Sequence, residues 1–172
     1  MRARAFTLVE LIVVIVILAI MAATVVPSVA ISSQARQRSA ASLLARNLMY
    51  AQARAVATGR RGWMVINPAT ETVTYSEDIA GVATAIIDPA TGTQMTTVLG
   101  AAAVIDGVAG TAIGNVSGST AALTIGFDWQ GRPVDSLGAL LTANQTISVT
   151  SGAANAVTVT IVAETGAITV SW

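Results

Sequence analysis

Residues 6–26 read FTLVELIVVIVILAIMAATVV, and this stretch decides the architecture of the chain. It is almost continuously apolar, and Arg2 and Arg4 precede it. Its 21 residues would rise about 31 Å as an α-helix, close to the roughly 30 Å hydrocarbon core of a bilayer. The stretch predicts one membrane-spanning helix. Arg2 and Arg4 favour a cytoplasmic N-terminus, although Arg36 and Arg38 follow the stretch and weaken that charge bias.

A secretory signal peptide is the second interpretation of the same segment. Its basic region would be Arg2 and Arg4, its apolar region residues 11–26, and its cleavage site the small residues that end at Ala30. This interpretation predicts a secreted β-rich adhesin or binding module. Glu10 argues against it, because a carboxylate in a lasting membrane helix costs on the order of 2.5–3.5 kcal/mol near the centre and marks a functional candidate. The alternative interpretation is that the Glu10 side chain only extends to the membrane–water interface beside Arg4.

Beyond Pro27, which would kink the helix without ending it, the sequence predicts an amphipathic second half over residues 27–59. Apolar residues recur there at steps of three and four, which places them on one face of a helix, with Arg46 opposite. Gly59 and the basic pair Arg60-Arg61 are typical of a helix C-terminus. The apolar face comprises Ala41, Leu44, Leu48, Ala51 and Ala55.

Residues 60–172 change from helical periodicity to alternation and predict an antiparallel, β-rich domain. Residues 63–66 and 72–75 look like a hairpin closed by residues 67–70. Residues 123–129, 147–149, 157–161 and 168–172 alternate, and residues 79–118 predict short strands and loops. The predicted fold class is therefore α+β, a long N-terminal helix packed on a β-rich domain.

Composition excludes most enzyme classes. The 172 residues are 53% hydrophobic and 10% charged, and they include neither His nor Cys. That removes thiol nucleophiles, imidazole bases and the usual zinc sites, and a chain without Lys has no P-loop. A membrane-tethered enzyme that uses Asp or Glu with Ser or Thr is the third alternative, but no such constellation is visible. We expect no catalytic residue, cofactor or metal.

Charge is distributed unevenly along the chain. From Gly62 onward a single arginine, Arg132, stands against eight acids, a net charge of −7 that argues against nucleic acid as a ligand. Asp128 and Asp135 could offer oxygen ligands to calcium, but their spacing is not that of an EF-hand, and an ordinary turn is the favoured interpretation. The eight acids are Glu71, Glu77, Asp78, Asp88, Asp106, Asp128, Asp135 and Glu164.

The basic leader, the motif Phe6-Thr-Leu-Val-Glu10 and the apolar helix together resemble the precursors of type IV pilins and pseudopilins. The resemblance implies cleavage between Ala5 and Phe6 by a prepilin peptidase, followed by N-methylation of Phe6. It implies that Glu10 attracts the α-amine of a neighbouring subunit's Phe6, and that Pro27 is the proline at which family helices bend. The family usually has Gly before the cut, and Ala5 departs from that pattern.

Residues 44–64 resemble the H-type minor pseudopilins of type II secretion and the FimT-like minor pilins, which implies a domain of two sheets. The expected protein is a structural subunit of the inner membrane, with residues 1–5 as leader and residues 60–172 in the periplasm. The implied partners are prepilin peptidase, other pilin subunits, the inner-membrane assembly platform and membrane lipid. Relatives in DNA uptake carry arginines near the C-terminus, but residues 164–170 here read ETGAITV, so no nucleic acid is expected.

Overall fold

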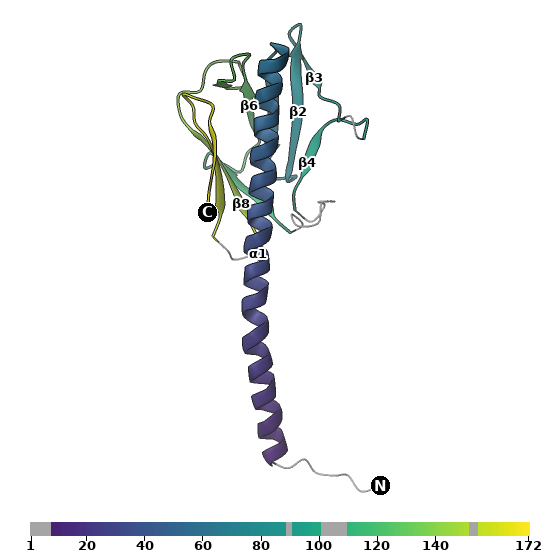
Figure 1. The fold of residues 1–172 in the computed structure, drawn as a ribbon, viewed down its shortest axis with the longest axis vertical. Coiled ribbons are helices and arrows are strands. Elements are labelled where there is room, and N and C mark those ends of the chain that lie inside the picture. Colours follow the sequence, from purple (N-terminus) through teal and green to yellow (C-terminus); the bar gives the residue numbers. More distant parts are fainter. Residues whose placement is uncertain (1–7, 89–90, 101–109, 152–154) are drawn as a thin grey trace.

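A single long helix carries a domain of two antiparallel sheets. The computed structural model describes residues 8–88, 91–100, 110–151 and 155–172, and it describes the backbone alone for residues 22–32. The helix, α1 (Leu8–Thr58), has 51 residues, and its N-terminal half extends away from the sheets (Figure 1). It ends at Thr58, and the next residue, Gly59, has a φ of +67°, the left-handed conformation that favours glycine after a helix. This confirms the predicted helix C-terminus.

Pro27 lies inside α1, which continues across it as one helix. A proline in a helix interior removes one backbone hydrogen bond without necessarily ending the helix. The helix thus does not end at Pro27, and a bend there within a filament stays a prediction.

The first sheet has six strands in the order β3-β2-β1-β6-β7, with β4 also paired to β2. All its pairings are antiparallel. The predicted hairpin is present, since Asn67 pairs with Thr72, and the Asn67 side chain accepts hydrogen bonds from the amides of the turn. The strands are β1 (Gly62–Asn67), β2 (Thr72–Ile79), β3 (Val82–Ala85), β4 (Thr96–Val98), β6 (Leu123–Phe127) and β7 (Pro133–Val134).

The second sheet has four strands in the order β10-β9-β8-β5, again antiparallel. Alternate residues of β8 and β9 are buried, as the sequence pattern predicts. The strands are β5 (Ala112–Val116), β8 (Gln145–Thr150), β9 (Val157–Ile161) and β10 (Ile168–Ser171).

The core lies where the C-terminal half of α1 packs against both sheets (Figure 1). The predicted apolar face is confirmed, because its five residues are at most 2% exposed while Arg46 is exposed. Leu44 and Leu48 of the helix share one cluster with Tyr75 and Phe127 of the first sheet and with residues of the second. Three of the five residues are alanines, and such small side chains let backbones approach closely. The α+β fold of one helix and two sheets is thus confirmed.

The expected alternation is wrong at two strand ends. Strand β6 ends at Phe127, so Trp129 belongs to the following turn and is 60% exposed. Trp172 lies beyond β10 and is 66% exposed, with its ring 5.8 Å from the Arg38 guanidinium carbon. Alternation marks which face a side chain takes, but not where the strand stops.

Candidate assembly surface

The predicted site residues belong to the first half of α1. Glu10 lies in the first helical turn and is exposed. The N-terminus of a helix carries a partial positive charge, so a carboxylate in this turn is favourably placed. Ala5 and Phe6, which flank the predicted cut, lie outside the described residues. The structure thus places Glu10 but does not test its pairing with Phe6.

An apolar surface surrounds the helix on all sides between Leu8 and Met21. Twelve large apolar side chains in this range are exposed, from 44% at Val14 to 73% at Leu8. A helix that packs on one sheet face needs one apolar stripe, whereas a helix that is apolar all round needs an apolar environment all round. We call residues 8–21 the assembly surface.

The predicted span covers residues 6–26, and the structure describes the side chains of residues 8–21 within it.

Within the part of the chain that the structure describes, no helix combines the length and hydropathy of a membrane span.

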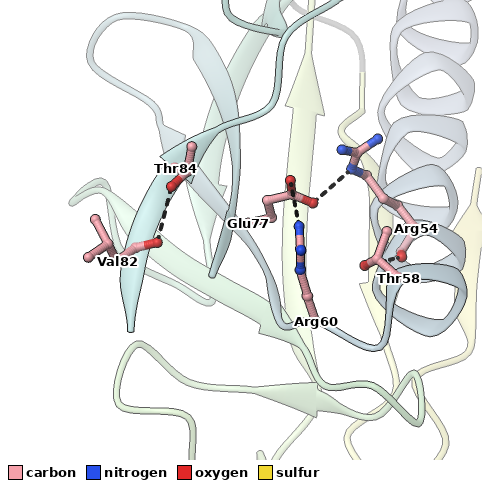
Figure 2. A network of polar contacts seen from close by, with 6 residues as sticks. All are labelled: Arg54, Thr58, Arg60, Glu77, Val82 and Thr84. Carbon is pink, nitrogen blue, oxygen red and sulfur yellow. Dashed lines mark hydrogen bonds and ion pairs between the residues drawn. The ribbon is translucent and has the colours of Figure 1, made fainter. Parts of the chain in front are cut away.

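An ion-pair cluster fixes the far end of α1 to the first sheet. Glu77 of β2 is 8% exposed, and its carboxylate accepts a hydrogen bond from Arg54 Nε at 3.2 Å. Arg60 Nη1 lies 3.8 Å from the other carboxylate oxygen, so both arginines point at Glu77 (Figure 2). The hydrogen bond to Glu77 raises the pKa of Arg54. Sequence reasoning favoured helix capping for Arg60, with phosphate or an acid of a partner as the alternative, and did not identify Glu77 of the next hairpin strand as its neighbour.

The acidic segment that could have offered calcium ligands is an ordinary pair of turns. Asp128 Oδ1 accepts the amides of Gln130 and Arg132, and Oδ2 pairs with the Arg132 guanidinium at 2.8 Å. Burial alone would raise the pKa of Asp128, but the bonds from Arg132 and Gln130 outweigh it and lower the pKa. Asp135 Oδ1 accepts two amides of its own turn. Among the described residues, no three acids gather where they could hold a metal.

One structural residue escaped the sequence analysis. Gln52 of α1 donates to the carbonyl oxygens of Gly131 and Gly166, at 2.7 and 3.2 Å. These glycines lie in turns of different sheets, so one amide ties the helix to both. The only signal in the sequence is a polar residue next to the apolar face, which is too common to be diagnostic.

Comparison with known proteins supports both halves of this architecture. The family model described as the prokaryotic N-terminal methylation motif matches residues 1–26. No curated protein matches the chain. The crystal structure of the type IV minor pilin FimU of Pseudomonas aeruginosa is similar at a TM-score of 0.51 and 14% identity, over 78% of this chain and 87% of that one.

At this identity the structural likeness shows the fold, and the motif supplies the second, independent support. A motif of this type implies a membrane-anchored precursor that is later built into a filament. The N-terminal segment thus matches the methylation motif, and the chain has the fold of a type IV minor pilin.

Proposed function

We propose that the protein is a non-enzymatic minor subunit of a type II secretion pseudopilus or a type IV pilus. The observation that carries the proposal is the assembly surface, an exposed helix that is apolar all round and holds Glu10 in its first turn. The methylation motif covers this same segment. Such a helix has two suitable environments in turn, the bilayer before assembly and a bundle of like helices after it.

Residues 6–26 would span the inner membrane, with the leader in the cytoplasm and the sheet domain in the periplasm. Cleavage after Ala5 removes Arg2 and Arg4 and creates a charged amine on Phe6. That amine and Glu10 are each costly alone in an apolar medium, but they are compatible as a pair. Pairing between neighbouring subunits would set the register of the helices, while van der Waals packing between their apolar surfaces would hold the bundle together.

The mature N-terminus tests the processing step. The protein is recovered from membranes of a host that has a prepilin peptidase, and its intact mass and N-terminal peptide are measured. We expect a chain that begins at N-methylated Phe6. A chain that begins at Ile31 would show that Glu10 leaves with a signal peptide, and the secreted-module interpretation would replace this one.

The role of Glu10 is tested by Glu10→Ala, with Glu164→Ala as the matched control on an exposed turn. We expect Glu10→Ala to insert into the membrane normally but to be depleted from sheared filaments or pseudopili, because the Phe6 amine loses its counter-charge. Glu164→Ala should assemble like the parent chain. Equal incorporation of both variants would refute the register role.

A further inference from the structure

An open pocket of about 430 Å³ lies where α1 ends, at the opposite end of the helix from the assembly surface. It forms between the end of the helix, the end of β2 and the turns that flank β7. The proposed assembly mechanism does not use it. Its polar and aromatic lining consists of Arg60, Arg61, Asp78, Asp128, Trp129 and Arg132.

The two carboxylates of the pocket are engaged locally. Asp128 is satisfied by the amides of its own turn and by Arg132. Asp78 Oδ1 accepts the amide of Gly81 at 2.8 Å. Arg60 leans toward Glu77. Both acids and two of the three arginines in the pocket therefore have local polar contacts. Arg61 is the third arginine.

Arg61 is half-buried, and its guanidinium contacts two uncharged groups. Its guanidinium carbon lies 5.3 Å from the ring centre of Trp63. On another side it packs against Gly138, where an added Cβ would lie 2.5 Å from Nη1. Across the described ranges of the chain, no carboxylate forms an ion pair with Arg61. A stacked guanidinium is pre-organised, and its planar fork of donors matches a carboxylate.

The surroundings of Arg61 indicate what kind of anion fits. Trp129 and Leu140 line the same pocket and are 60% and 48% exposed, so apolar surface lies beside the cation. A bare phosphate ion would leave that surface in water and would bring its higher charge near Asp78 and Asp128. Each carboxylate of a peptide brings only one charge to the cation, and its apolar neighbours can cover the apolar surface.

We propose that this pocket binds an acidic peptide segment of a neighbouring subunit. Arg61 would bind the carboxylate of the peptide, and Trp129 and Leu140 would pack against its apolar side chains. The proposal rests on the proposed function in one respect, that a filament supplies the neighbour. Recognition would resemble other interfaces in which a fixed arginine and an exposed tryptophan dominate the binding energy.

The test is a binding titration of the full chain in micelles of a neutral detergent. The probes are a dye-labelled, end-blocked peptide LDLDL and its uncharged twin LNLNL, followed by fluorescence anisotropy. We expect saturable binding of LDLDL that weakens as salt is added, and binding of LNLNL that is about tenfold weaker or more.

Three variants assign that binding to the pocket. Arg61→Gln should weaken LDLDL binding about tenfold, and Arg61→Lys should fall between, because it keeps the charge but loses the fork. The matched control Arg46→Gln removes an exposed arginine from the outer face of α1 and should bind like the parent. Thermal unfolding of each variant verifies that it is folded.

Three outcomes would overturn the proposal. The first is that LDLDL does not bind, and the second is that it binds Arg61→Gln as tightly as the parent. The third is that inorganic phosphate displaces LDLDL as effectively as unlabelled LDLDL does, which would make the pocket a site for free anions. Neither outcome touches the proposed function, which stands or falls on the mature N-terminus and on Glu10→Ala.

Discussion

The side-chain amide of Gln52 ties α1 to turns of both sheets, so its loss should loosen both contacts. Replacing it by Leu leaves two turn carbonyls without their donor, at Gly131 and Gly166, which are themselves buried. We expect Gln52→Leu to lower the free energy of unfolding by about 1–3 kcal/mol. Thermal unfolding in micelles measures this, at about 3 °C per kcal/mol. Gln34→Leu, on an exposed position of the same helix, should change the midpoint far less.

Tyr75 gives the protein an alkaline pH dependence. Burial raises the pKa of Tyr75 to about 12, and its hydroxyl lies 3.3 Å from Thr97 Oγ1. Between about pH 10 and 12 the unfolded chain releases this proton while the folded chain keeps it, so the free energy of unfolding falls by about 2–3 kcal/mol as pH rises.

Tyrosine substitutions isolate that effect, because the chain has two tyrosines and Tyr50 is 43% exposed. In Tyr50→Phe the phenolate absorbance should titrate near pH 12, and stability should keep its alkaline decline. In Tyr75→Phe the decline between pH 10 and 12 should be reduced. An unchanged decline in Tyr75→Phe would mean that other groups cause it.

At the scale of elements, the end of α1 is attached to β2 through Glu77. The Arg54 side chain is 33% exposed and the Glu77 side chain 11%, so the pair is partly screened by solvent. We expect Arg54→Ala to lower the free energy of unfolding by about 1 kcal/mol, mainly because Glu77 loses its closest donor. Arg46→Ala, on the exposed face of the same helix, should be close to neutral. Equal effects in urea unfolding would show that the attachment contributes nothing.

At the scale of the whole molecule, folding and assembly occupy different halves of α1. Among the side chains of α1 that the structure describes, the buried ones run from Gln37 to Ala55, whereas residues 8–21 are exposed. A fragment that begins at Ser33 should therefore stay in solution without detergent and unfold within about 3 °C of the full chain, a difference near 1 kcal/mol. A fragment that begins at Asn47 loses Leu44 and three core alanines and should not unfold cooperatively. Calorimetry distinguishes these outcomes.

Periodicity predicted much of the fold, because burial on one face of a regular element leaves a repeat in the sequence. The apolar stripe of α1, the hairpin of β1 and β2 and the inward residues of β8 and β9 all follow from steps of three and four or of two. Of the predicted site, the structure places Glu10 in the first helical turn. The cut at Ala5 and Phe6 rests on the motif alone.

The sequence by itself determined that residues 6–26 need an apolar environment and that a β-rich domain follows the helix, because both depend on neighbours along the chain. Tertiary structure alone decided the contacts of Gln52, Glu77 and Arg61. The partners of Gln52 lie 79 and 114 residues away, and a lone polar side chain leaves no periodic trace. The partner of such a polar side chain depends on how the two sheets pack around α1. Local propensity does not encode that arrangement.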